Sequence, residues 1–202
     1  MEKQFFVRLI SRKVPESALA YCIQLFEEAP FHFKISKKRA TKLGDYRFDP
    51  RAKSHTITVN ENLHPFQFLI TYIHEVAHRR VHEQHRKQAP HGPHWKNEFR
   101  RLMLPMLRPE VFPELVLRAL ARHMKNPKAS AAADITLVNA LRKFDDDSGG
   151  ITLAQLAINE EFSFRGRSFR KLEVKRTRAL CLDLMNQKRY LVPLMVEIEN
   201  YG

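Results

Sequence analysis

The spacing of apolar positions predicts helices and strands in turn over the first 130 residues. Apolar residues at helical spacing predict helices over 16–29, 65–86, 94–103 and 113–124. Alternation of apolar and polar residues predicts strands over 31–35, 41–48 and 55–60. Asp49-Pro50 separates the last two strands, which suits an antiparallel pair joined by a longer loop. Together these elements indicate an α+β domain.

The last third of the chain has a different pattern and is predicted to form a short helix and a small β unit. The run over 129–133 ends the first part, and Asp134 suits the N-cap of a helix ending near Phe144. Residues 145–150 have the composition of a loop, and strands are predicted over 162–164, 169–184 and 190–198. We therefore expect a domain over 1–133, followed by a helix and a small basic β-rich C-terminal unit over 134–202.

Composition narrows the class of protein. Of the 202 residues, 44% are hydrophobic and 28% are charged, which is typical of a globular protein and excludes a collagen-like or low-complexity chain. No apolar run approaches the roughly 20 residues of a membrane helix. Arg8 interrupts the short apolar N-terminal stretch, so no secretory signal is predicted and we expect a cytoplasmic protein. Two cysteines, Cys22 and Cys181, cannot build a four-cysteine zinc ribbon, so a metal site must depend on histidine and carboxylate.

The net charge of +13 lies in two windows of the sequence. Residues 34–53 hold eight Lys or Arg against two Asp, and residues 165–189 hold nine against one Glu and one Asp. These windows carry +6 and +7, while the other residues carry equal numbers of acids and bases. Two concentrated basic blocks indicate a surface for a polyanion, most commonly nucleic acid.

The chemistry of the chain centres on His74-Glu75-Val76-Ala77-His78, an HExxH motif within the long predicted helix. Positions four apart lie one turn apart on a helix, about 6 Å along its axis. Two imidazoles placed in this way can bind one Zn²⁺ with bonds of about 2.0–2.1 Å. Glu75 lies beside them, where it can reach a water molecule without binding the metal itself.

Other histidines of the same helix are too distant to be the third ligand. His82 and His85 lie about 12 and 16 Å from His74 along a straight helix axis. The metzincin spacing is excluded because it requires Gly and His where this chain has Val81 and Gln84. Two candidates for the third ligand are left open.

The first candidate is Glu98, which lies 20 residues after His78, at the spacing of the gluzincin pattern. The second is His91, in the tight turn Pro90-His91-Gly92-Pro93, where Gly92 would allow the backbone to approach the metal closely. Residue spacing alone does not decide between these two.

Four separated stretches resemble the SprT-like metalloproteases, the family of SprT and of Spartan, a protease that degrades proteins crosslinked to DNA. They are Thr41-Lys42-Leu43-Gly44-Asp45-Tyr46-Arg47, Ile57-Thr58-Val59-Asn60, His74-Glu75-Val76-Ala77-His78 and His91-Gly92-Pro93-His94-Trp95-Lys96. The resemblance covers about residues 15–130 and implies a zincin-like metalloprotease domain with a small antiparallel β-sheet and an HExxH active-site helix. It also implies that the third ligand is His91. The family usually ends in a four-cysteine zinc ribbon, which this chain lacks.

This resemblance implies a zinc-dependent endopeptidase with one Zn²⁺ per chain. His74, His78 and His91 would hold the metal and leave a fourth position for water, whose pKa the metal lowers. Glu75 would take the proton of that water and pass it to the leaving amine. The strand over 42–48 is a candidate edge strand that could pair with the backbone of a substrate.

The family and the charge together imply protein substrates associated with or crosslinked to DNA, a role in DNA–protein crosslink repair and association with the nucleoid. The candidate DNA-binding residues are Arg165, Arg167, Arg170, Lys171, Lys175, Arg176 and Arg178. On one extended strand, Arg176 and Arg178 would share one face, and Lys171 and Lys175 the other. Two alternatives are a DNA-binding protein with a structural, non-catalytic zinc site and a peptidase that processes soluble peptides without DNA.

Overall fold

The computed structural model describes residues 1–39, 42–85, 89–129, 134–144 and 151–200. The chain divides into two compact units, Met1–Ala129 and Ser130–Gly202. The predicted domain boundary after residue 133 and the loop predicted over 145–150 fall on or beside residues outside the described ranges. No helix in these ranges is long and apolar enough to cross a membrane.

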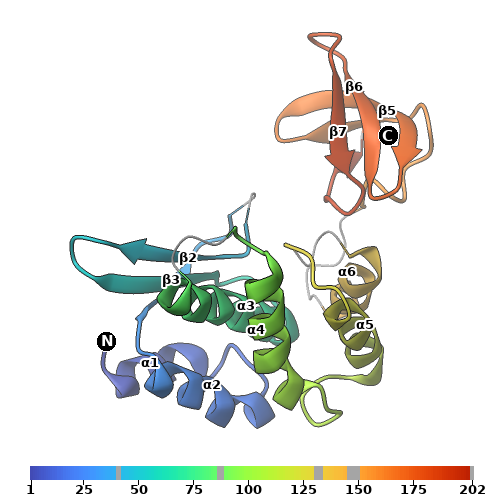
Figure 1. Cartoon of the computed structure of the whole chain (residues 1–202). Helices are drawn as coiled ribbons and strands as arrows, with labels where there is room; N and C mark the ends of the chain where they lie inside the picture. Colours follow the sequence, from blue (N-terminus) through green and yellow to red (C-terminus); the bar gives the residue numbers. More distant parts are fainter. Residues whose placement is uncertain (40–41, 86–88, 130–133, 145–150, 201–202) are drawn as a thin grey trace. The chain divides into compact units, whose positions relative to one another are not determined.

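Unit 1 combines helices with a three-stranded sheet (Figure 1). Its helices are α1 (Lys3–Ile10), α2 (Glu16–Glu28), α3 (Pro65–Gln84), α4 (Pro93–Met103), the short 3₁₀ helix η1 (Leu104–Met106) and α5 (Glu114–Met124). Its strands are β1 (His32–Ser36), β2 (Gly44–Asp49) and β3 (Ser54–Asn60). The three strands and the four longer helices predicted for this region are present with small shifts of their ends. No element was predicted from the sequence over residues 3–10, although Phe6 and Ile10, four positions apart, form the buried face of α1.

The sheet has the strand order β1-β3-β2. β2 and β3 form the predicted antiparallel pair, with Tyr46 opposite Ile57, whereas β1 runs parallel to β3. The carbonyl of Leu43 accepts from the N–H of Asn60 at 2.9 Å. Backbone groups alternate in direction along an antiparallel strand, so those of Gly44 and Tyr46 point to the edge of β2 that faces away from β3. β2 is therefore an edge strand.

One face of the sheet carries the core of unit 1. Phe33 of β1 is buried against Phe6 of α1 and Tyr72 of α3, with ring centroids 5.3 and 5.8 Å away. Phe6 also stacks on Phe26 of α2 at 4.3 Å. The opposite face is polar, with an exposed Lys34 and several half-buried threonines. The strands thus present an apolar face to α1, α2 and α3, as their alternating sequence predicts.

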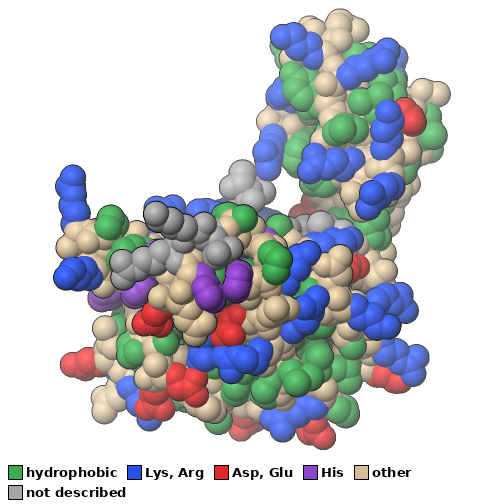
Figure 2. Space-filling model, viewed as in Figure 1, with side chains coloured by type: hydrophobic (Ala, Val, Ile, Leu, Met, Phe, Trp, Pro, Cys, Tyr) green, Lys and Arg blue, Asp and Glu red, His purple; other side chains and the backbone are tan. Residues whose placement is uncertain are grey.

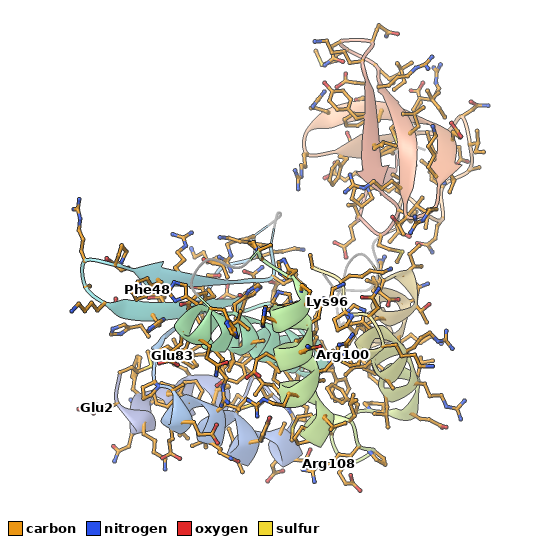
Figure 3. The ribbon with its side chains drawn as sticks, viewed as in Figure 1. Glu2, Phe48, Glu83, Lys96, Arg100 and Arg108 are labelled. Atoms are coloured by element: carbon orange, nitrogen blue, oxygen red, sulfur yellow. The ribbon has the colours of Figure 1, made fainter. Side chains whose placement is uncertain are left out.

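α4 is tied to the end of α5 by its polar side chains (Figure 3). Lys96 donates to the side chain of Asn126 at 2.8 Å, and Arg100 donates to the backbone carbonyl of Met124 at 2.8 Å. These bonds fix the position of α4, which begins at Pro93, two residues after His91.

Unit 2 contains α6 (Ile135–Arg142) and a five-stranded sheet of order β7-β6-β5-β4-β8. The strands are β4 (Glu161–Phe164), β5 (Arg167–Lys175), β6 (Arg178–Asp183), β7 (Arg189–Pro193) and β8 (Glu199–Asn200). Asp134 caps α6 as predicted, accepting from the N–H of Leu137 at 3.3 Å. The described part of the chain thus forms a mixed α and β protein with two small sheets, compatible with the α+β class.

Two strand predictions in unit 2 were wrong in extent. The single strand expected over 169–184 is a hairpin of β5 and β6, which turns at Arg176 with a positive φ of 49°. The strand expected over 190–198 ends at Pro193, where β7 stops. Alternating patterns do not reveal where a long β segment turns back, because both arms of a hairpin keep the same period.

Candidate metal centre

α3 places His74 and His78 one turn apart on one edge of the helix. The side chain of His64 caps the helix by accepting from the N–H of Phe66 at 3.4 Å, and Pro65 occupies the first turn. The helix is buried along Leu69, Ile73 and neighbouring apolar positions, which fixes its rotation against the core. The two histidines consequently keep a constant position relative to the sheet.

The turn before α4 brings His91 to the same place. His91 has a positive φ of 60°, a left-handed conformation that costs about 1–2 kcal/mol for a residue with a Cβ. Gly92 has a φ of −70°, and a Cβ there would lie 3.1 Å from the carbonyl oxygen of Ala89. The glycine therefore allows a close contact within the turn, not the approach to a metal that we expected from the sequence.

The Nε2 atoms of the three histidines converge. They are 3.2 Å apart for His74 and His78, 2.9 Å for His78 and His91, and 3.2 Å for His91 and His74. A tetrahedral zinc site with bonds of about 2.0–2.1 Å separates two ligand nitrogens by about 3.3–3.4 Å. A hydrogen bond could satisfy one pair of rings only, whereas a divalent cation takes a lone pair from all three. The three side chains thus fit one metal ion.

Electrostatics keep these rings neutral and able to bind a metal. Burial, together with the neighbouring histidines, holds the pKa of His74 well below its ordinary value. Burial and the nearby His91 lower the pKa of His78 to about 3, and burial also lowers the pKa of His91. Neutral imidazole is the form that ligates metals, so the site favours a cation over protons.

Trp95, the only tryptophan of the chain, forms a platform against the three histidines. Its ring centroid lies 4.6 Å from those of His74 and His91 and 5.3 Å from that of His78. The side chain is buried, and its Nε1–H donates to the backbone carbonyl of His74 at 3.4 Å. Trp95 lies within a stretch quoted above, but the sequence alone did not assign it this role.

Glu75 lies on the adjacent edge of α3, under β2. The backbone N–H of Tyr46 donates to its carboxylate. Burial, together with the negative charge of Asp45, raises the pKa of Glu75 to about 8. A cation bound at the three histidines would oppose this shift, because positive charge favours the ionised carboxylate.

A comparison with protein-family models identifies the family. Residues 12–112, half of the chain, match the SprT-like family, and this segment includes α3, the turn of His91 and β2. The chain belongs to the SprT-like family. Searches among curated proteins and solved structures found no match. The family consists generally of metallopeptidases that are usually zinc dependent, so membership suggests a metalloprotease-like function for this SprT-like chain.

The structure separates the other candidate ligands from this SprT-like site. Glu98 accepts two hydrogen bonds from Arg101, at 2.7 and 2.8 Å, and is not among the groups that converge with the three histidines. His82 packs on Phe48 with ring centroids 4.6 Å apart, and the His85 ring lies tilted against that of His94, with centroids 4.1 Å apart. Figure 2 shows histidine side chains gathered on the visible face of unit 1.

Lys171 is wrongly placed in the set of candidate DNA-binding residues. Only 3% of the residue is exposed, and its Nζ donates to the backbone carbonyls of Leu153 and Leu156 at 2.9 and 2.5 Å. A β-bulge between Lys171 and Glu173 shifts the register of β5, so Lys171 and Lys175 do not share a strand face as the sequence predicted. Lys171 secures the core of unit 2 and cannot reach a phosphate.

The other candidate DNA-binding residues of this SprT-like chain are at the surface, but they differ in whether their charged groups already have partners. Arg167 lies over the ring of Tyr190 at 4.7 Å and forms an ion pair with the buried Asp183. Arg170 pairs with the exposed Glu161 at 2.6 Å, and Arg165 lies over the ring of Phe164 at 5.0 Å. These three guanidinium groups already have partners within unit 2.

The β5–β6 hairpin carries the remaining candidates. Lys175 and Arg178 are opposite each other in register, and Arg176 occupies the turn between them. All three are exposed, and Lys175 also lies 3.5 Å from Glu173. Because Arg176 is in the turn, it does not share a strand face with Arg178, contrary to the expectation for one long strand. The turn instead gathers three cations within four residues.

Proposed function

We propose that this SprT-like chain is a zinc-dependent endopeptidase with a zincin-like active site. The observation that supports the proposal most directly is the convergence of three half-buried imidazole Nε2 atoms beside the buried carboxylate of Glu75. His74, His78 and His91 would hold the zinc ion, and Glu75 would be the catalytic carboxylate. A structural zinc site usually completes its coordination with a fourth protein ligand, and among the described residues only these three converge.

The chemistry divides between the metal and Glu75. Bound zinc supplies Lewis acidity, which polarises a carbonyl and lowers the pKa of water. Glu75 accepts the proton of the attacking water and later donates it to the leaving amine. The burial that raises the pKa of Glu75 suits this second step, because a carboxyl with a higher pKa retains a proton more readily.

We propose that the free edge of β2 binds the substrate backbone. The backbone groups of Gly44 and the carbonyl of Tyr46 point to this edge, beside the part of α3 that carries Glu75, whereas the N–H of Tyr46 donates to Glu75. An extended peptide can add to such an edge by main-chain hydrogen bonds, which select for conformation more than for sequence. This mode of binding suits a protease that acts on unfolded segments of many proteins.

We further propose that the substrates are proteins associated with DNA or crosslinked to it. The cations of the β5–β6 hairpin support this, and among the charged side chains on the visible face of unit 2 basic ones outnumber acidic ones (Figure 2). In unit 1, residues 34–53 form a second basic region, where Lys34 is exposed and the side chain of Arg47 is 73% exposed. Arg39, Lys42 and Arg47 surround Asp45, so part of this charge is already balanced.

The proposed function is tested with purified full-length protein and labelled protamine, an unfolded basic polypeptide that binds DNA. We expect cleavage that stops with a chelator, resumes with added zinc and is faster when the protamine is bound to DNA. Cleavage that is insensitive to chelation would contradict the zinc mechanism. Equal rates with and without DNA would favour a peptidase for soluble peptides. Zinc binding without any cleavage would favour a DNA-binding protein with a structural metal site.

The contribution of the hairpin to DNA binding has its own prediction. Arg176→Ala/Arg178→Ala is expected to weaken DNA binding and to reduce the slope of log K against log salt by about 1.4–1.8, the value for two phosphate contacts. Arg118→Ala/Arg122→Ala on α5 removes the same charge and is expected to leave the slope unchanged. Binding is measured by fluorescence anisotropy over a range of salt concentrations. An unchanged slope in the hairpin variant would make the Lys34 and Arg47 surface the better candidate.

A further inference from the structure

β2 packs against α3 near Glu75, and Gly44 lies at this contact. A Cβ at position 44 would lie 2.7 Å from Cγ2 of Thr71, 2.9 Å from Oε1 of Glu75 and 3.0 Å from Cγ of Glu75. Ordinary Cβ contacts are longer than this, so a side chain at position 44 requires something to move. Gly44 is not among the residues with positive φ, so its glycine supplies space and not an unusual backbone conformation.

The same stretch of β2 also holds the carboxylate by a hydrogen bond. Tyr46, two positions after Gly44, donates its backbone N–H to Glu75. Residues two apart on a strand have the same orientation, so Gly44 and Tyr46 both border the Glu75 carboxylate, one through the space at its Cβ position and the other through its backbone N–H. Between them, Asp45 is tied by Arg39, Lys42 and Arg47, which anchors this segment of the strand. The glutamate is therefore confined between its helix and an anchored strand.

We propose that Gly44 is a positioning residue that fixes the orientation of the Glu75 carboxylate. A glutamate side chain has several rotamers, and a catalytic group gains rate from being held in one productive orientation. A methyl group at position 44 would displace the carboxylate or lift the strand, and either change weakens the hydrogen bond from Tyr46. The inference rests on the proposed role of Glu75. It adds that catalysis requires a residue without a side chain at position 44 of β2, which zinc binding alone does not require.

The kinetic test uses Gly44→Ala in the full-length protein with labelled protamine on DNA. We expect kcat to fall at least tenfold, KM to change by less than threefold and zinc content to stay at the wild-type value. Thr71→Ser removes Cγ2, the closest atom, and keeps the hydroxyl that bonds to the carbonyl of Gln67. We expect Gly44→Ala/Thr71→Ser to regain stability but not kcat, because the two contacts with Glu75 persist. If stability and kcat both recover in the double variant, the inference is overturned, because Gly44 would then serve only the packing of β2 against Thr71.

A second measurement is independent of catalysis and uses the metal-free protein. We introduce Gly44→Ala into the wild-type protein and into the Glu75→Ala variant, whose side chain lacks Cγ and Oε1. The urea midpoint of unfolding is expected to fall at least twice as far in the wild-type background as in the Glu75→Ala background. A double-mutant cycle of this kind isolates the interaction between the two positions. Equal shifts in both backgrounds would overturn the inference.

A matched control excludes a general effect of adding a methyl group to glycine. Gly166 in unit 2 has a φ of 71°, and a Cβ at this position would have no described neighbour within 4 Å, so Gly166→Ala strains the backbone without a collision. We expect this variant to be less stable with unchanged kcat. If the wild-type protein does not cleave protamine, the proposed function fails while the urea cycle still reports on Gly44. If wild type cleaves and Gly44→Ala keeps kcat within threefold, the positioning role fails alone.

Discussion

Glu75→Gln is expected to lower the rate of protamine cleavage by about 10²–10⁴ while the protein keeps its zinc. Glutamine preserves the length and shape of the side chain but cannot accept a proton, so the loss measures general-base catalysis. The amide can still accept the N–H of Tyr46, so the packing under β2 is retained. The measurement compares initial rates and zinc content of both proteins at the same concentration.

Glu83→Gln is the matched control for this prediction. Glu83 lies on the same helix and pairs with Arg79 at 2.8 Å, with more than half of its side chain exposed. We expect this variant to cleave at the wild-type rate. If Glu75→Gln cleaves as fast as wild type, Glu75 is not the general base and the hydrolytic mechanism proposed for this site is incorrect.

His91→Ala is expected to lose most of the bound zinc and to lower zinc affinity more than about 100-fold. Loss of an outer-shell partner alone costs about 10–100-fold, and removal of a ligand costs more. Trp95 gives a direct readout because its ring lies 4.6 Å from His91 and is the only indole in the chain. Titration with Co²⁺, which quenches nearby fluorescence, measures the affinity, and elemental analysis measures the zinc retained.

The controls for this prediction use the alternative ligands. Glu98→Ala, His82→Ala and His85→Ala are expected to retain zinc, because the structure places all three away from the converging nitrogens. His91→Gly relaxes the positive φ and is expected to lose zinc as well, which separates loss of the ring from loss of the turn. Full zinc retention in His91→Ala, with loss in Glu98→Ala, would reverse the ligand assignment.

Local patterns in the sequence predicted the elements that carry the candidate site, but not all of the contacts between them. The helical period over 65–86 and the four-residue spacing of His74 and His78 depend only on helix geometry, so α3 could be predicted directly. The place of His91 depends on a left-handed residue in a turn, and it was inferred from family resemblance because spacing left Glu98 open. The approach of Gly44 to Glu75 arises only when β2 packs on α3, and no local pattern encodes it.

Unit 2 shows a different limit of prediction from sequence patterns. The alternation of residues correctly indicated β structure, yet it could not show that Arg176 lies in a turn. Lys171 shares the buried face of β5 with Phe169, so an ammonium group expected at the surface is buried, and the bulge that follows Lys171 changes the face of the residues after it. The distribution of charge in the sequence thus indicates that unit 2 is basic. It does not show that Lys171 is bonded to the carbonyls of Leu153 and Leu156 and is therefore not available to a ligand.

The open edge of β2 also bears on how this protein behaves at high concentration. An edge that can receive a substrate strand can in principle receive the same strand of a second molecule, which is a common route to aggregation. Here the edge strand is only six residues long and alternates glycine and aromatic residues with Asp45, Arg47 and Asp49. Charged side chains on a short edge strand disfavour stacking of identical copies, and the +13 net charge adds repulsion between molecules. The strand is therefore suited to transient pairing with foreign polypeptides while its own copies stay apart.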